Sequence, residues 1–182
     1  MNFEKIKAVS LENGATKSAV IQVDSIVLSK EFREICKSNQ CGYYGKCWMC
    51  PPDIGEIDEL MKKIGEYSYA LLYQTIHTLE DSFDIEGMSK GSFKHCRISR
   101  KVEKALDCYL PDNYLHLICG GCRYCKKCAK QEGKECYYPS EALASMEAYG
   151  IDVYQTSKTT DLKYINGANT VTYFSIILFG EK

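Results

Sequence analysis

Cysteine is the residue that most constrains how this chain folds. The chain has 11 cysteines among 182 residues, gathered mainly in two short blocks at residues 36–52 and 119–139. A chain of this length buries an adequate apolar core without disulfide staples, so a disulfide scaffold is not needed to explain them. An odd number of cysteines also fits poorly with complete pairing. Clustered, reduced thiols are typical of metal sites, so we expect a fold that presents two cysteine-rich metal-binding loops.

The second block carries the strongest motif in the sequence. Its cysteines follow one another in Cys-x2-Cys steps and end with a more distant cysteine: Cys119, Cys122, Cys125, Cys128 and Cys136. Steps of this kind let a short loop wrap a cuboidal cluster and offer thiolates to different irons. Four or five thiolates also exceed what a tetrahedral zinc ion needs. We interpret the block as an iron–sulfur site; a zinc site and a metal-free loop are the alternatives.

The first block is a weaker motif on its own. Its four cysteines, Cys36, Cys41, Cys47 and Cys50, end in a Cys-Pro-Pro turn. Proline after a ligand fixes the chain where no amide is needed, and the interleaved tyrosine and tryptophan side chains would keep water from a site. The block is interpreted as a second set of metal ligands. The alternative is an aromatic turn with buried free thiols.

The hydrophobic periodicity predicts strands and helices that interleave along the chain. We expect one or two strands at 19–28, strands at 69–76, 114–118, 151–156 and 170–178, and helices at 30–38, 54–67, 89–110 and 140–149, with a helical turn at 160–165. Residues 1–15 are either a frayed start or a short first helix. This order is typical of an α/β (or α+β) fold, in which helices cover a mixed β-sheet. We expect a single metal-binding domain over residues 1–182, with the two cysteine blocks meeting at one edge of the sheet.

Charge and hydropathy exclude several classes of protein. The formal net charge is −1, so no overall field draws the chain to nucleic acid or to a membrane surface. The longest apolar run, at residues 171–179, is far too short to span a bilayer. The first residues contain no apolar stretch typical of a secretory signal. We therefore expect a cytoplasmic protein that binds neither nucleic acid nor a membrane.

Some polar residues outside the blocks allow two interpretations. Basic residues at 89–104 form either a solvated helix face or a docking site for an acidic redox partner or a phosphate. His116, three residues before Cys119, is either a strand-packed histidine or a donor to the metal site. Glu147 is a proton donor near that site, a helix cap or a solvated surface residue. Cys96 and Cys108 are interpreted as free thiols on the long helix.

The motifs together resemble a known family. Residues 36–52, residues 120–139, the stretch Ser145-Met-Glu-Ala-Tyr-Gly150 and the closing strand are similar to the predicted metal-binding proteins called domain of unknown function 2284. The resemblance covers most of the chain. It implies ferredoxin-like metal binding and the following ligands: Cys36, Cys41 and Cys50 in the first block, and Cys122, Cys125, Cys128 and Cys136 in the second. Cys47 and Cys119 look like additions in this chain.

The sequence and the resemblance predict an iron–sulfur protein with one or two [4Fe–4S] clusters. We expect it to act in electron transfer, or as a redox accessory subunit, together with a redox partner protein. One alternative is a redox enzyme whose cluster has an open iron. Another is a zinc-stabilised binding module with no redox role. The sequence contains no nucleophile triad, phosphate-binding glycine loop or HExxH motif, so it does not decide whether the protein is an enzyme.

Overall fold

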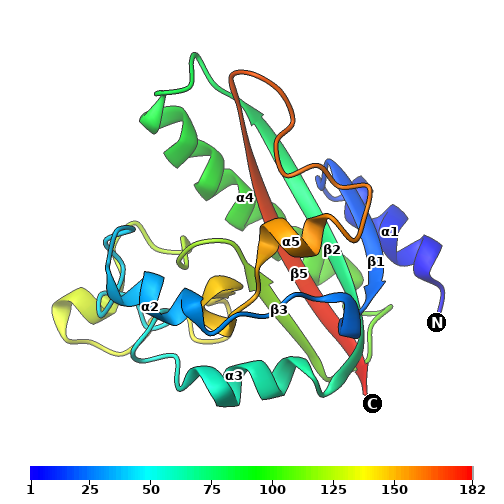
Figure 1. Cartoon of the computed structure of the whole chain (residues 1–182), viewed down its shortest axis with the longest axis horizontal. Helices are drawn as coiled ribbons and strands as arrows, with labels where there is room; N and C mark the ends of the chain where they lie inside the picture. Colours follow the sequence, from blue (N-terminus) through cyan, green and yellow to red (C-terminus); the bar gives the residue numbers. More distant parts are fainter. Residues whose placement is uncertain (182) are drawn as a thin grey trace.

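A mixed five-stranded sheet runs through the computed structural model, which describes residues 1–181 (Figure 1). The strand order is β1-β2-β5-β3-β4. All neighbours are antiparallel except β3 and β4, which are parallel. The strands are β1 (Lys17–Gln22), β2 (Tyr67–Thr78), β3 (Tyr114–Ile118), β4 (Ala144–Ser145) and β5 (Thr170–Glu181). The predicted α/β class, with one mixed sheet covered by helices, is confirmed.

The two long strands, β2 and β5, are covered on both faces. Leu72 and Ile176 lie in one buried cluster, whereas Leu71 and Ile177 lie in another, because side chains alternate between the two faces of a strand. Strands that are buried on both faces have nearly continuous runs of apolar residues in their sequences. Both strands accordingly consist largely of apolar residues.

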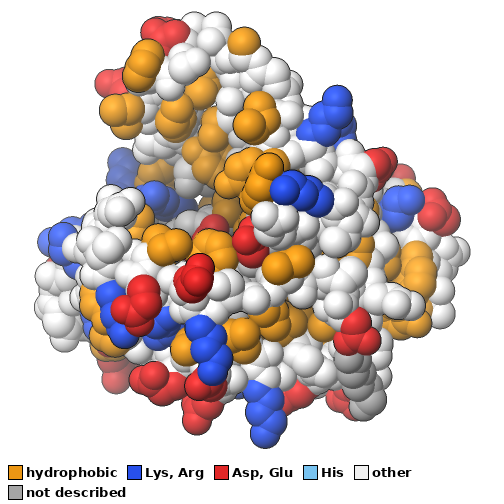
Figure 2. Space-filling model, in the orientation of Figure 1, with side chains coloured by type: hydrophobic (Ala, Val, Ile, Leu, Met, Phe, Trp, Pro, Cys, Tyr) orange, Lys and Arg blue, Asp and Glu red, His pale blue; other side chains and the backbone are white. Residues whose placement is uncertain are grey.

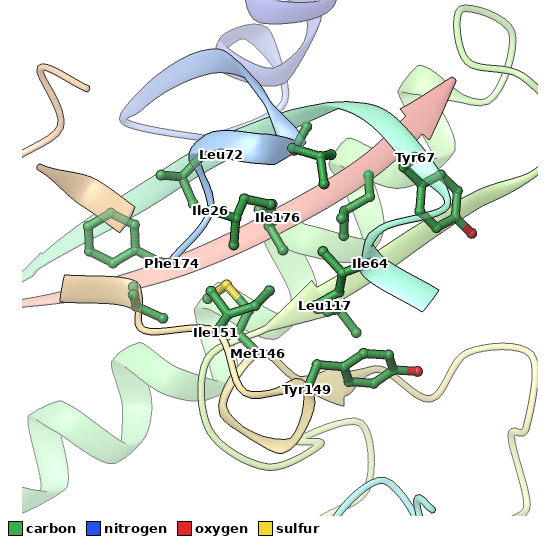
Figure 3. Close-up of a cluster of buried hydrophobic side chains, with 14 of the residues drawn as sticks. Ile26, Ile64, Tyr67, Leu72, Leu117, Met146, Tyr149, Ile151, Phe174 and Ile176 are labelled. Atoms are coloured by element: carbon green, nitrogen blue, oxygen red, sulfur yellow. The ribbon is translucent and has the colours of Figure 1, made fainter. Parts of the chain in front are cut away.

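The helices divide between these two faces. They are α1 (Phe3–Glu12), α2 (Glu31–Lys37), α3 (Ile57–Ile64), α4 (Ile85–Leu106) and α5 (Val153–Ser157). Helices α1 and α4 pack on the face that carries Leu71 and Ile177. Helix α3 and the segment around Met146 and Ile151 cover the other face, where the side chains interdigitate around Ile176 (Figure 3). None of the helices in residues 1–181 is long and apolar enough to cross a membrane.

Two predictions near the C-terminal end of the chain are wrong. The expected helix at 140–149 is instead the short strand β4 and a 3-10 turn, Glu147–Tyr149. Its backbone extends the sheet, since Met146 donates a hydrogen bond to the Ile118 carbonyl at 2.7 Å. The expected strand at 151–156 is helix α5, which begins where the Asp152 carboxylate accepts the Gln155 amide at 2.8 Å.

Other boundaries shift by a few residues. The expected strand at 19–28 ends at Gln22 and continues as a 3-10 turn. The expected helix at 54–67 runs from Ile57 to Ile64, and Asp53, which precedes it, forms an ion pair with Lys130. Helix α4 starts four residues earlier than expected because Asp84 caps it, and it ends before Cys108. The expected helical turn at 160–165 consists of bends.

Candidate metal centre

The two cysteine blocks lie side by side next to β3, as the sequence predicted (Figure 1). The second block begins where β3 ends, and the Cys119 amide donates to the Phe174 carbonyl at 2.9 Å. The first block joins α2 to α3. The blocks meet where a Cβ on Gly121 would lie 3.3 Å from the Cys50 sulfur. Glycine at this position therefore allows the second loop to approach the first closely.

Aromatic and charged side chains hold the two loops together. The Trp48 indole nitrogen donates to the Lys134 carbonyl at 3.0 Å. The Lys130 ammonium forms an ion pair with Asp53 and lies 4.3 Å from the centre of the Trp48 ring. The Arg123 guanidinium lies 4.2 Å from the centre of the Tyr43 ring. Each of these contacts joins residues from different blocks, so neither loop has to hold its shape alone.

The cysteines predicted as second-block ligands face one pocket. Cys122, Cys125, Cys128 and Cys136 all line it, together with Trp48 and the rings of neighbouring tyrosines. Its free volume is about 20 Å³, which is close to the space that one water molecule occupies. Four thiols with an aromatic surround are a donor set that suits an iron–sulfur cluster. Because the pocket is this small, the second-block loop has to open before a cluster can bind there.

The cysteines predicted as first-block ligands face a separate and roomier pocket. Cys36, Cys41 and Cys50 line a cavity of about 310 Å³, together with Tyr44 and Glu147. The predicted ligands therefore divide between two adjoining pockets according to their block, three in one and four in the other.

Cys47 lies between these two pockets. It is buried, and its thiol is a neighbour of the thiols of Cys50 and Cys128. The Cys50 thiol beside it is the main cause that lowers the pKa of Cys47 to about 6. The same contact, together with burial, raises the pKa of Cys50. The resemblance identified Cys47 only as an addition to the family pattern. The spacing of the cysteines along the chain does not show that this first-block residue contacts the second block.

Burial raises the pKa of several other thiols. It raises the pKa of Cys122 to about 11 and raises the pKa of Cys36 as well. Thiols bind metals as thiolates, so loading either pocket releases protons.

Glu147 is a carboxylate for which the sequence allowed more than one interpretation. It lines the first-block cavity, and it accepts a hydrogen bond from the Gly120 amide at 3.1 Å. Burial raises the pKa of this carboxyl group. Of the interpretations given above, the helix cap is wrong because the expected α-helix at 140–149 does not form, and Glu147 only starts a short 3-10 turn. Glu147 instead places an acid beside three thiols.

The remaining candidates lie away from the pockets. His116 is buried in β3, where its Nε2 lies 2.9 Å from the Tyr73 hydroxyl and its Nδ1 3.5 Å from Glu103. The strand-packed interpretation of His116 is therefore confirmed. The Cys119 thiol accepts the Phe174 amide at 3.3 Å and lines neither cysteine pocket. Cys96 is buried on α4, and Cys108 is exposed beyond its end.

The thiols in the described part of the chain are not arranged around a single ion. Within residues 1–181, no three histidine, cysteine or acidic side chains converge closely enough to hold one metal ion. A tetrahedral zinc ion needs its thiolates roughly 4 Å apart, since each Zn–S bond is about 2.3 Å. A cuboidal cluster is a larger body that takes thiolates at separate irons.

Comparison with known proteins agrees with a metal-binding role. The family model described as "Predicted metal-binding protein (DUF2284)" matches residues 19–179, a range that contains both cysteine blocks. No curated protein and no solved structure matches the chain.

Proposed function

The chain belongs to the DUF2284 family of predicted metal-binding proteins, and from this premise we propose that it binds iron–sulfur clusters and transfers electrons. In this proposal each cysteine pocket holds a [4Fe–4S] cluster. The ligands are Cys122, Cys125, Cys128 and Cys136 at the second block, and Cys36, Cys41 and Cys50 at the first. The electrons pass to or from a redox partner protein, in the cytoplasm, where thiols stay reduced.

One observation carries the proposal: the seven cysteines divide between two adjoining pockets by block. A protein that stores one structural metal ion needs a single closed set of four ligands. Two neighbouring thiol pockets, linked through the buried Cys47, are the arrangement expected of an electron relay.

The chain's own residues have two tasks in this function. A cluster supplies one-electron redox chemistry when it is bound. The cysteines fix its position, while Trp48 and the tyrosines of the second-block pocket keep water away. Cations near a cluster favour its more negative, reduced state and raise its potential. Lys130 is one such cation of the second block, and it is held against Trp48 and Asp53.

The test is a metal and sulfide analysis of the full chain purified without oxygen. We expect about eight irons and eight sulfides per chain, with absorption near 400 nm, because two [4Fe–4S] clusters contain that number. About four irons would contradict the second cluster. Zinc without sulfide would overturn the iron–sulfur proposal and favour a zinc-stabilised binding module.

A pair of variants tests the ligand set. Cys125→Ala removes a proposed ligand and should cost about four irons, the content of one [4Fe–4S] cluster. Cys108→Ala is the matched control, because Cys108 is exposed and lies outside both blocks. It should keep the full iron content. A Cys125→Ala variant with wild-type iron and sulfide would contradict the assignment.

A second candidate function is favoured by the first-block cavity. Only three of the proposed ligands line it, and the cavity of about 310 Å³ also contains the carboxylate of Glu147. A cluster held by three cysteines leaves one iron open to a small ligand, which favours a redox enzyme over a simple relay. Cyanide tests this candidate, since it binds an open iron. It should change the spin-resonance spectrum of the reduced protein, and an unchanged spectrum would exclude the open-iron enzyme.

A further inference from the structure

A larger cavity lies on the other side of the second block. Its volume is about 820 Å³, and it is lined by Phe93, Arg97, Arg100 and Lys104 of α4 and by Arg123 and Tyr124 of the cysteine loop. The Tyr124 ring also lines the second-block pocket. The groove and that pocket therefore share the Tyr124 side chain as part of their walls. Neither the proposed clusters nor their ligands account for it.

The charges around this groove are unbalanced. Its one lining carboxylate, Glu141, is already paired with Arg100, which also pairs with Glu103. Four other cations line the groove: Arg97, Lys104, Arg123 and Lys126. Within residues 1–181, none of these four forms an ion pair. Several cations around one cavity attract a negatively charged ligand, since low-dielectric walls focus their field.

Arg123 is held in place without using all of its donors. Its guanidinium lies 4.2 Å from the centre of the Tyr43 ring and 5.8 Å from that of Phe93. Its Nε is buried and has no hydrogen-bond partner in the described chain. Buried donors in proteins are nearly always satisfied, so this atom calls for an acceptor.

The remaining walls of the groove are mainly apolar. Phe93 and Tyr124 contribute aromatic rings to them. Figure 2 shows basic side chains at the bottom of a hollow between the part of the molecule that carries the start of α4 and the part that carries the cysteine blocks. An apolar cavity with a few convergent charged groups is the usual form of a small-molecule site, and its volume is in the usual range of 300–1,000 Å³.

We propose that this groove binds an anionic small molecule of nucleotide size, with a planar aromatic ring and a phosphate or carboxylate group. The ring packs between the walls formed by Phe93 and Tyr124. The anionic group meets Arg97, Lys104 and Lys126. The bound molecule lies against Tyr124 and so next to the second-block pocket.

A concave site favours this ligand over an acidic protein. A specific protein partner typically covers about 800 Å² of a fairly flat surface. Here the cations line a cavity, where only a small molecule or a narrow extended chain reaches them. Lys94 and Lys101 on the same helix are exposed and do not line the groove. An acidic protein partner would contact these two lysines as readily as the cations of the groove, whereas a small molecule in the groove would not.

The test measures binding of two phosphate–nucleoside pairs to the full chain purified without oxygen. The probes are FMN and AMP, each compared with riboflavin or adenosine, which lack the phosphate. We expect at least one phosphorylated probe to bind at least tenfold more tightly than its partner and to weaken as salt is added. If neither nucleotide binds, or if the phosphate makes no difference, the proposal is overturned.

Matched variants locate the site. The double variant Arg97→Ala/Lys104→Ala should weaken nucleotide binding at least tenfold. The control Lys94→Ala/Lys101→Ala removes the same charge from the same helix and should leave binding unchanged. Equal effects of the two variants would contradict a site in the groove. A polyglutamate peptide that displaces the nucleotide, and binds more tightly than it, would show an acidic-polypeptide surface instead.

Discussion

The Cys47 thiol of the first block is a direct neighbour of the Cys128 thiol of the second block. Cys128 lines the second-block pocket, whereas Cys50, the other partner of Cys47, lines the first. The three thiols form a continuous connection between the two proposed metal sites. A thiol in this position fixes the distance between the sites, whether or not it binds metal itself.

Replacing Cys47 tests this positioning role. We expect Cys47→Ala to keep the iron content of the wild type, because seven other cysteines supply the proposed ligands. The loss of a buried side chain and its contacts should lower the free energy of unfolding by about 1–2 kcal/mol. Iron analysis and urea denaturation measure the two effects. A loss of about four irons, one [4Fe–4S] cluster, would instead identify Cys47 as a ligand.

Trp48 should protect the second-block site from oxygen and water. Its indole nitrogen donates a hydrogen bond to the Lys134 carbonyl, and the Lys130 ammonium lies over its ring. Trp48, a first-block residue, therefore covers the second-block pocket. Trp48→Ala should leave the cluster content of protein purified without oxygen nearly unchanged, but the absorption near 400 nm should fade several-fold faster in air. Tyr154→Ala is the control, because this exposed tyrosine lies on α5. Equal fading rates in both variants would show that Trp48 does not shield the site.

The sequence predicted the centre of the fold better than its edge. The apolar run at 114–118 coincides with β3 because a buried strand needs continuous apolar residues. Residues 140–149 contain good helix formers, yet their backbone extends the sheet through Met146. Tertiary hydrogen bonding outweighs local propensity there, since intrinsic helix preferences are worth less than about 1 kcal/mol per residue.

The sequence also predicted some features of the candidate site and missed others. The spacing of the cysteines predicted two blocks and their meeting, and both follow from loops that leave neighbouring elements. The place of Cys47 between the pockets, and of Glu147 in the first cavity, depends on how the two loops cross. Short-range spacing contains no information on that crossing, so the position of Cys47 was not predictable, and a place for Glu147 near the metal site was only one of the interpretations that the sequence allowed.

Arg100 should be the most sensitive charged residue outside the cysteine blocks. Its guanidinium is nearly buried, pairs with Glu103 and Glu141, and donates to the Ser140 carbonyl at 2.8 Å. Arg100→Ala leaves Glu141 without its ion-pair partner and Glu103 with only His116 beside it, and breaking a buried pair in this way costs about 3–5 kcal/mol. Thermal unfolding of this variant and of Lys101→Ala, its exposed neighbour, measures the difference. Similar melting temperatures would show that the Arg100 pairs contribute little.

Acid should destabilise the protein through His95. Burial, followed by the charges of His77 and His116, lowers the pKa of His95 from 6.5 to about 3. The folded protein therefore keeps His95 neutral where the unfolded chain protonates it. The stability that this neutral state contributes is complete above pH 6.5 and is lost as the pH falls from 6.5 towards 3, by about 1.4 kcal/mol per pH unit.

The His95 contribution is isolated by a variant that cannot titrate. His95→Gln keeps a polar group near Thr75, whose hydroxyl lies 2.8 Å from the His95 Nδ1. Acid also affects the metal sites, but it does so equally in both proteins, so the difference between them reports His95 alone. Urea denaturation at pH 7 and pH 5 should show a loss about 2 kcal/mol larger in the wild type than in His95→Gln. Equal losses would mean that His95 is protonated in the folded protein at pH 5, and that its contacts with Thr75 and the Phe174 carbonyl outweigh the cost of burying the charge.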